Sequence, residues 1–127
     1  MSKRILVVDD DADTRTMLRF HCESLGFEVS EAADGHEAVK VALRDQPDLV
    51  IMDMAMPMVD GVNSTRTMRQ HDTLRDTPIV ALTGFGSFYR PRALEAGCKL
   101  VLTKPIDLDS LRPVLAEHIG PQNPGSN

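Results

Sequence analysis

The sequence predicts an α/β protein with a doubly wound parallel sheet, and three observations support this fold class. Short, β-branched-rich apolar runs are typical of strands that are buried on both faces of a parallel sheet. The chain contains four of them, at residues 5–8, 49–52, 79–82 and 100–103. Helical patterns lie between the runs, as a β-α alternation requires. The length of 127 residues suits about one domain with its own core.

The first apolar run predicts a strand, followed by a helix and a second strand. Asp11 can cap the helix, because its carboxylate can accept hydrogen bonds from the unpaired N–H groups of the first turn. Gly26 is typical of a residue that ends a helix. The apolar residues at helical spacing between them are Met17, Leu18, Cys22 and Leu25. Residues 27–32 alternate weakly and predict a second strand near an edge of the sheet.

The middle of the chain predicts a second helix, a third strand and a third helix. The second helix follows the turn pair Asp34-Gly35 and ends before Pro47, with Ala38, Val39 and Ala42 as its apolar residues. The third strand ends at Asp53, and a loop with Pro57 and the turn pair Asp60-Gly61 follows. Residues 62–70 predict the third helix, whose apolar side consists of Val62, Thr65 and Met68.

The last third of the chain predicts two further strands and two helices. Pro91 is tolerated only in the first turn of a helix, so we expect a short fourth helix at about residues 92–96, which ends at Gly97. Asp107 caps the last helix, whose inward side consists of Leu108, Leu111 and Leu115. We expect one domain over residues 1–119 and a flexible tail or the start of a linker at 120–127. Met1 and this tail favour a stand-alone protein over a piece of a larger one.

Composition and charge exclude several classes of protein. The net charge is −5 and no block is rich in Lys or Arg, so we expect no direct binding to nucleic acid, whose phosphates require neutralisation. No apolar stretch approaches the roughly 20 residues that cross a bilayer, and the run after Arg4 is too short for a signal-peptide core. Cys22 and Cys98 have no metal-ligand spacing and are interpreted as buried, reduced thiols. We therefore expect a cytoplasmic protein without membrane insertion.

The four apolar runs end on reactive polar side chains. The residues that follow them are Asp9 and Asp10, Asp53, Thr83, and Lys104 with Pro105. In an open α/β sheet, ligands bind outside the carboxyl ends of the strands. Two or three carboxylates, a hydroxyl and an ammonium should therefore gather at the edge where these ends meet, which we call the carboxyl edge. Such a set suits a divalent cation and a phosphoryl group.

These residues resemble the receiver domains of bacterial response regulators, the family of the small chemotaxis regulator, from residue 3 to about residue 119. The similarity rests on the acidic pair Asp9-Asp10, the segment 53–61, Thr83 with Gly84, and Lys104 with Pro105, all in the family's order and at similar separations. The resemblance implies the flavodoxin-like (βα)5 fold, a five-stranded parallel sheet with strand order 2-1-3-4-5.

The resemblance also implies a metal site. Asp10 and Asp53 would bind Mg²⁺ directly, with Mn²⁺ as an alternative, while Asp9 would act through water and the backbone carbonyl of Ala55 would supply a further ligand. The donor types agree with this assignment, because Mg²⁺ keeps several waters and takes one or two protein carboxylates. A divalent cation also relieves the repulsion between clustered carboxylates.

The activity implied by the resemblance is that of a phosphoacceptor switch. Asp53 would accept a phosphoryl group from a histidine kinase or a histidine phosphotransfer protein, as a carboxylate nucleophile. Lys104 would pair with one phosphoryl oxygen, and the Thr83 hydroxyl would donate to another. The protein would not be an enzyme beyond its own Mg²⁺-dependent phosphorylation and dephosphorylation, and a changed surface would signal to a protein partner downstream.

Some positions depart from the family. Val101 stands where an aromatic residue usually moves on phosphorylation, and Ala55 and Phe85 occupy positions that tune access to the site, so turnover should differ from the chemotaxis protein. The chain has five aromatic residues, and Phe85, Phe88 and Tyr89 are predicted to share one loop after Thr83. We interpret this loop as the candidate switch, since a hydroxyl pulled toward the phosphoryl group would move it. The alternative is that one or more of these rings simply pack over the edge of the sheet.

Three other functions fit the sequence less well. Asp9, Asp11 and Asp13 fit the first half of a calcium loop, but the Gly and Glu which that loop requires are replaced by Thr14 and Phe20. A haloacid-dehalogenase-type phosphatase, also with an Asp nucleophile, requires a different spacing of its aspartates after strand one. A phosphorylation-independent interaction module would keep the fold, but the presence of all the site residues disfavours it.

Overall fold

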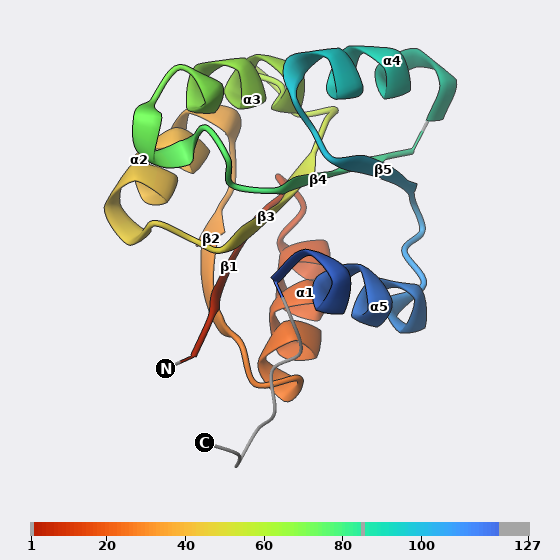
Figure 1. Cartoon of the computed structure of the whole chain (residues 1–127). Helices are drawn as coiled ribbons and strands as arrows, with labels where there is room; N and C mark the ends of the chain where they lie inside the picture. The colour runs from red at the N-terminus through yellow and green to blue at the C-terminus, as the bar shows by residue number, and fades with distance from the viewer. Residues whose placement is uncertain (1, 85, 120–127) are drawn as a thin grey trace.

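The computed structural model describes residues 2–84 and 86–119 of the chain (Figure 1). Its five strands form one parallel sheet in the order β2-β1-β3-β4-β5, which confirms the predicted α/β fold and strand order. Phe85 and the expected tail at 120–127 lie outside the described residues, so the tail and the domain limits stay predictions. Within the described part of the chain, no helix is long and apolar enough to cross a membrane.

Strands and helices alternate along the described chain. The strands are β1 (Arg4–Val8), β2 (Glu28–Ala32), β3 (Leu49–Asp53), β4 (Ile79–Thr83) and β5 (Leu100–Thr103). The α-helices are α1 (Ala12–Ser24), α2 (Gly35–Asp45), α3 (Gly61–Arg69), α4 (Gly86–Ala96) and α5 (Leu108–Ile119). A single 3-10 turn, η1 (Asp72–Leu74), precedes β4 and was not predicted.

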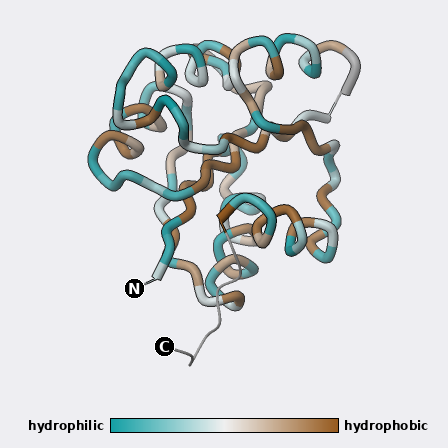
Figure 2. The backbone as a smooth tube through the Cα atoms, viewed as in Figure 1, coloured by the Kyte–Doolittle hydropathy of each residue, from teal (hydrophilic) through white to brown (hydrophobic). Residues whose placement is uncertain are grey.

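Both faces of the sheet are covered by helices. Figure 1 shows α2, α3 and α4 on one side and α1 and α5 on the other. Successive strand side chains point to opposite faces, so in β1 Leu6 and Val8 join the core under α2–α4, whereas Ile5 and Val7 join the core under α1 and α5. A strand buried on both faces needs an apolar residue at every position, which explains the continuous apolar runs (brown in Figure 2).

The predicted helix caps are present. The carboxylates of Asp11, Asp34, Asp60 and Asp107 accept hydrogen bonds from the backbone N–H groups of Asp13, Glu37, Asn63 and Asp109. Gly26 and Gly97 follow α1 and α4 with φ values of 95° and 118°, a left-handed conformation that costs glycine little. The start of each of these four helices is therefore set by a local signal in the sequence.

The fourth helix was predicted wrongly. It begins at Gly86, so Pro91 is its sixth residue rather than a member of its first turn. Pro91 removes one early helical hydrogen bond, but α4 buries Ala93 fully and packs Tyr89 against the core. Most of the stability of a protein helix comes from such packing, and it outweighs the local penalty here. For the same reason, α5 continues through Pro113.

The longer helix also corrects the position of two aromatic residues. Phe88 and Tyr89 lie in the first half of α4, not in a loop after Thr83. Their rings meet edge to face, with centroids 4.8 Å apart. A movement of the backbone that carries these side chains would therefore be a movement of α4 and not of a loop.

Candidate functional site

Strand register brings the predicted site residues to one edge of the sheet. Val8 in β1 pairs with Met52 in β3, so the residues that follow them, Asp9 and Asp53, lie at the same level. Asp53 in turn lies opposite Leu82, one residue before Thr83. Thr83 pairs with Thr103, and the N–H of Lys104 donates to the Thr83 carbonyl at 2.8 Å. The predicted gathering of these groups at the carboxyl edge is therefore present in the structure.

Three carboxylates form the acidic part of the site. One oxygen each from Asp9, Asp10 and Asp53 lie within 4.8 Å of one another. Asp9 and Asp53 are buried at the ends of β1 and β3, whereas Asp10 is exposed. Two carboxylates of the cluster are therefore buried, and the third is open to solvent.

Lys104 lies over the buried pair. Its Nζ donates to Asp9 Oδ2 at 2.9 Å and lies 3.3 Å from Asp53 Oδ2. The other oxygen of Asp9 accepts from the N–H of Asp11 at 2.9 Å. Asp9 is thus held by a cation and a backbone donor, and it positions the lysine.

The electrostatics of the site follow from this arrangement. Burial raises the pKa of the Asp53 carboxyl to about 6, and the Asp9 charge acts in the same direction, whereas Lys104 opposes both. Burial lowers the pKa of the Lys104 ammonium, but its hydrogen bonds and charge interactions with the two aspartates outweigh burial, so this pKa is raised. At neutral pH, Asp53 is therefore mostly ionised and Lys104 is protonated.

The start of α3 packs against the back of Asp53. A Cβ atom added to Gly61 would lie 2.4 Å from the Asp53 carbonyl oxygen, so only glycine allows this approach. The Gly61 N–H donates to the Met54 carbonyl at 3.0 Å, and the Ala55 N–H donates to Asp53 Oδ1 at 3.1 Å. The segment 54–61 therefore fixes the Asp53 carboxylate and ties it to α3.

The donor set fits Mg²⁺. Oxygen ligands from one or two carboxylates, completed by water, are what this hard cation prefers. Asp10 has no hydrogen-bond partner among the described residues, while Asp9 is engaged by Lys104 and Asp11. This difference favours Asp10 over Asp9 as a direct ligand, while the Asp53 carboxylate is itself engaged by the Ala55 N–H and by Lys104.

The remaining predicted site residues are placed as follows. Thr83 is fully buried at the end of β4, and the space beside the Cα of Gly84 is open. Val101 is buried in the core under α2–α4, and the half-buried Tyr89 packs against that same core. Phe88 is exposed on α4, and Phe85 lies outside the described residues.

Neither cysteine belongs to the site. Both are free and buried, as expected. Burial raises the pKa of the Cys22 thiol to about 12 and also raises that of Cys98. A thiol reacts as its thiolate, so these two side chains act as apolar core residues.

An apolar surface beside the site was missed by sequence reasoning. Met17 on α1 is 40% exposed and lines a hollow of about 360 Å³ together with Lys104, Pro105 and Ile106. Met58, in the loop after Asp53, is 98% exposed and has a φ of 67°. The sequence contained a signal for this surface: Met58 lies between Pro57 and the Asp60-Gly61 turn, in a loop of a kind that few large apolar residues occupy.

Comparisons with known proteins agree with this geometry. Residues 5–116 match the family described as response regulator receiver domain. The chain is 38% identical over 106 residues to the alkaline phosphatase synthesis transcriptional regulatory protein PhoP of Bacillus subtilis, which covers 83% of the chain and 43% of PhoP. The chain spans less than half the length of several curated relatives, PhoP among them.

Two solved structures share the whole architecture. The receiver domain of the sensor histidine kinase PA1611 from Pseudomonas aeruginosa, with a magnesium ion in its active site cleft, matches with a TM-score of 0.88 and 35% identity, over 94% of this chain and 99% of that one. The chemotaxis protein CheY4 of Vibrio cholerae matches with a TM-score of 0.88 and 29% identity, over 94% and 100%. With its sheet order, its acidic cluster and these matches, the chain belongs to the response regulator receiver domain family.

Proposed function

We propose that this chain is the phosphoacceptor switch of a two-component system or phosphorelay, and that Asp53 accepts the phosphoryl group from a phosphohistidine on a kinase or phosphotransfer protein. The observation that carries the proposal is the position of Asp53: a buried carboxylate at the end of β3, clustered with two others and 3.3 Å from a lysine ammonium. A carboxylate held in this way is a suitable nucleophile for an electrophilic phosphorus.

The transfer step follows from these groups. An ionised Asp53 oxygen attacks the phosphorus, the bond from phosphorus to the imidazole nitrogen breaks, and the leaving imidazole keeps that electron pair. The product is an acyl phosphate on Asp53. Because its pKa is about 6, Asp53 needs no general base at neutral pH.

Charge neutralisation supports the step. Mg²⁺, held by Asp10, Asp53 and the Ala55 carbonyl, with Asp9 acting through water, would supply positive charge beside the phosphoryl oxygens. Lys104 supplies a second positive charge and can exchange its contact with Asp53 for a phosphoryl oxygen. Thr83, at the end of the neighbouring strand, donates its hydroxyl to another of these oxygens.

The apolar surface around the site favours a protein as the phosphodonor. Met17, Pro105 and Ile106 line the hollow next to Lys104, and Met58 projects from the loop after Asp53. Exposed apolar side chains that surround a charged centre are typical of protein interfaces. A cytoplasmic location goes with this proposal, because both cysteines are free thiols.

The test is phosphorylation by a small phosphodonor such as acetyl phosphate with Mg²⁺, followed by intact mass measurement. We expect the wild type to gain one phosphoryl group and Asp53→Asn to gain none. Asp107→Asn is the matched control, because Asn caps a helix as well as Asp does, and it should be labelled like the wild type. Labelling of Asp53→Asn, or repeated turnover of a generic phosphoester by the wild type, would contradict the proposal.

A further inference from the structure

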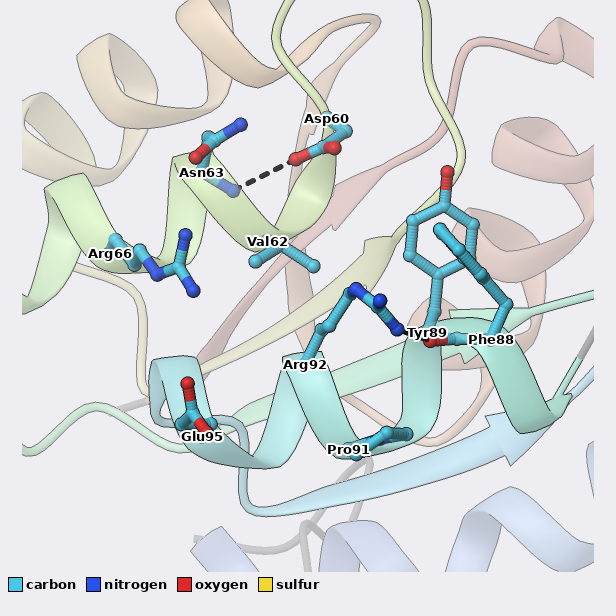
Figure 3. Close-up of a pocket in the computed structure, with 9 residues that line it drawn as sticks. All are labelled: Asp60, Val62, Asn63, Arg66, Phe88, Tyr89, Pro91, Arg92 and Glu95. Carbon is cyan, nitrogen blue, oxygen red and sulfur yellow. Dashed lines mark hydrogen bonds between the residues drawn. The ribbon is translucent and has the colours of Figure 1, made fainter.

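A groove lies between α3 and α4, on the sheet face opposite α1 and α5. Its volume is about 680 Å³, and its lining includes Val62 and Arg66 from α3 and Phe88, Tyr89, Arg92 and Glu95 from α4 (Figure 3). Figure 3 shows Asp60, Phe88 and Tyr89 toward one end of the groove and Arg66 and Glu95 toward the other. Arg66, Arg92 and Glu95 have no part in the fold or the site described above.

One end of the groove presents an aromatic side chain that is supported by an arginine. Phe88 is 54% exposed, and the Arg92 guanidinium lies 4.2 Å from the centre of its ring. Arg92 Nη1 also donates to the Phe88 carbonyl at 2.6 Å, which holds the two side chains together. Val62 and Tyr89 pack into the core beneath them. An exposed aromatic ring and an arginine held in this way resemble the residues that contribute most to protein interfaces.

The two helices carry positive charge on an acidic protein. Together α3 and α4 contain four arginines and one glutamate, whereas the whole chain has a net charge of −5. Arg69 is occupied, because it donates to the carbonyls of Leu74 and Gly97. Arg66 is exposed and has no hydrogen-bond or ion-pair partner among the residues that the structure describes. Two guanidinium groups, Arg66 and Arg92, therefore flank the groove with donors available to an incoming ligand.

We propose that this groove docks an acidic, amphipathic segment of a protein partner. An apolar side chain of the segment contacts Phe88, and carboxylates pair with Arg66 and Arg92, since guanidinium groups bind carboxylates through two parallel hydrogen bonds. A nucleic acid fits less well, because a continuous chain of phosphates would also have to pass the carboxylates of Asp60 and Glu95 at the two ends of the groove. A peptide can carry its carboxylates only at the positions that face Arg66 and Arg92.

The groove is connected to the phosphorylation site on both sides, and this part of the inference rests on the proposed function. The first residue of α3, Gly61, packs against the Asp53 backbone. The first residue of α4 follows Thr83 by three positions. A phosphoryl group on Asp53, with a new contact to Thr83, would therefore act on both walls of the groove, and phosphorylation would change its affinity for the acidic segment.

Peptide titration of the isotope-labelled full chain, followed by amide NMR, tests the docking. The probe is a synthetic helix of Glu and Leu of about 15 residues, a length at which isolated helices begin to form. We expect shifts in residues 62–66 and 88–95 and at least a tenfold loss of affinity in the double variant Arg66→Glu/Arg92→Glu. Phe88→Ala, which leaves the charges unchanged, should also weaken binding severalfold. Arg112→Glu on α5 is the matched control for one charge reversal on another exposed face, and its affinity should stay within about twofold, because Arg112 does not line the groove.

The outcomes separate the docking from its regulation. The docking proposal would be overturned if the wild type and the double variant had equal affinity, if a Lys/Leu peptide bound equally well, or if the shifts were confined to α5. Stronger shifts at residues 62–66 and 88–95 with a single-stranded oligonucleotide would also overturn it. Addition of Mg²⁺ and beryllofluoride, which mimics the phosphorylated state, should change the peptide affinity severalfold, and an unchanged affinity would overturn the coupling. Failure of the proposed function itself would be seen in the mass measurement, whereas peptide binding without beryllofluoride does not depend on it.

Discussion

Asp53 makes the stability of the fold depend on pH. Its pKa is raised from 3.8 to about 6 by burial and by the Asp9 charge. Between pH 3.8 and about 6, the folded protein therefore still holds a proton on Asp53, whereas the unfolded chain has already released it. The stability that this carboxyl contributes is present below pH 3.8 and is lost as the pH rises through 6, by up to about 3 kcal/mol.

Asp53→Asn should remove this dependence, because an amide does not ionise. Without metal, the free energy of unfolding of the variant should exceed that of the wild type at pH 7.5, and the difference should shrink as the pH falls from 6 to 4. Urea unfolding in the presence of a chelator, repeated over this pH range, measures the difference. Parallel pH profiles of the two proteins would show that Asp53 is not perturbed as described.

Met58 is a candidate for contact with the donor. Its positive φ is strained for a side chain other than Gly or Asn, and its side chain is almost fully exposed. Met58→Asn should therefore stabilise the fold by up to about 1 kcal/mol and slow phosphotransfer from a protein donor, while phosphorylation by acetyl phosphate stays unchanged. Gln46, with a φ of 49° at the end of α2, is the control: Gln46→Asn should leave both phosphorylation rates unchanged. Equal slowing with the small donor would refute a docking role.

Lys104 contacts the two buried carboxylates, and we propose that it also contacts the phosphoryl group. Lys104→Ala leaves the fully buried Asp9 without its cation, so we expect the free energy of unfolding to fall by about 1–3 kcal/mol. This loss is smaller than for a fully buried ion pair, because the lysine side chain is 27% exposed. The variant should still accept phosphate on Asp53 but lose the conformational response. Amide spectra before and after phosphorylation measure that response, and a wild-type pattern of shifts in the variant would disprove the role of Lys104.

At the scale of elements, local signals and packing contribute differently. The aspartate caps and Gly26 were predicted because a cap depends on a few adjacent residues. The length of α4 was not, because Pro91 lowers local helix propensity and only packing of Ala93 and Tyr89 on the sheet compensates for it. The helix that carries the proposed groove thus depends on tertiary contacts.

Pro91→Ala tests this balance. The substitution restores one helical hydrogen bond, so it should raise the free energy of unfolding by about 1 kcal/mol, which is less than the full helix penalty of proline because the unfolded chain gains freedom. Pro78→Ala, which lies before β4 and outside any helix, is the control and should not stabilise the protein. Denaturant unfolding measures both variants, and a loss of stability in Pro91→Ala would show that the proline fits α4 without cost.

At the scale of the whole molecule, the proposed cation site combines residues from the ends of two strands, β1 and β3. If Mg²⁺ binds the folded protein and not the unfolded chain, it should raise the melting temperature. At Mg²⁺ concentrations above the dissociation constant, this rise should grow with the logarithm of the concentration. Asp10→Ala should lose most of this effect. Asp13→Ala removes an exposed carboxylate of α1 outside the cluster and should keep the effect. The same melting shift in Asp10→Ala as in the wild type would place the metal elsewhere.

The sequence by itself determined the strands, the caps and the polar residues that end each strand, because these depend on hydrophobic periodicity and on neighbours along the chain. Parallel pairing then places those strand ends at one edge, so the members of the site could be predicted. How the helices cover the sheet decided which aspartate of the acidic pair is buried. It also decided that Lys104 holds Asp9, which lies 95 positions away in the sequence. The exposure of Met58 and the groove between α3 and α4 were likewise decided only by the tertiary structure, because burial is a property of packing between distant segments.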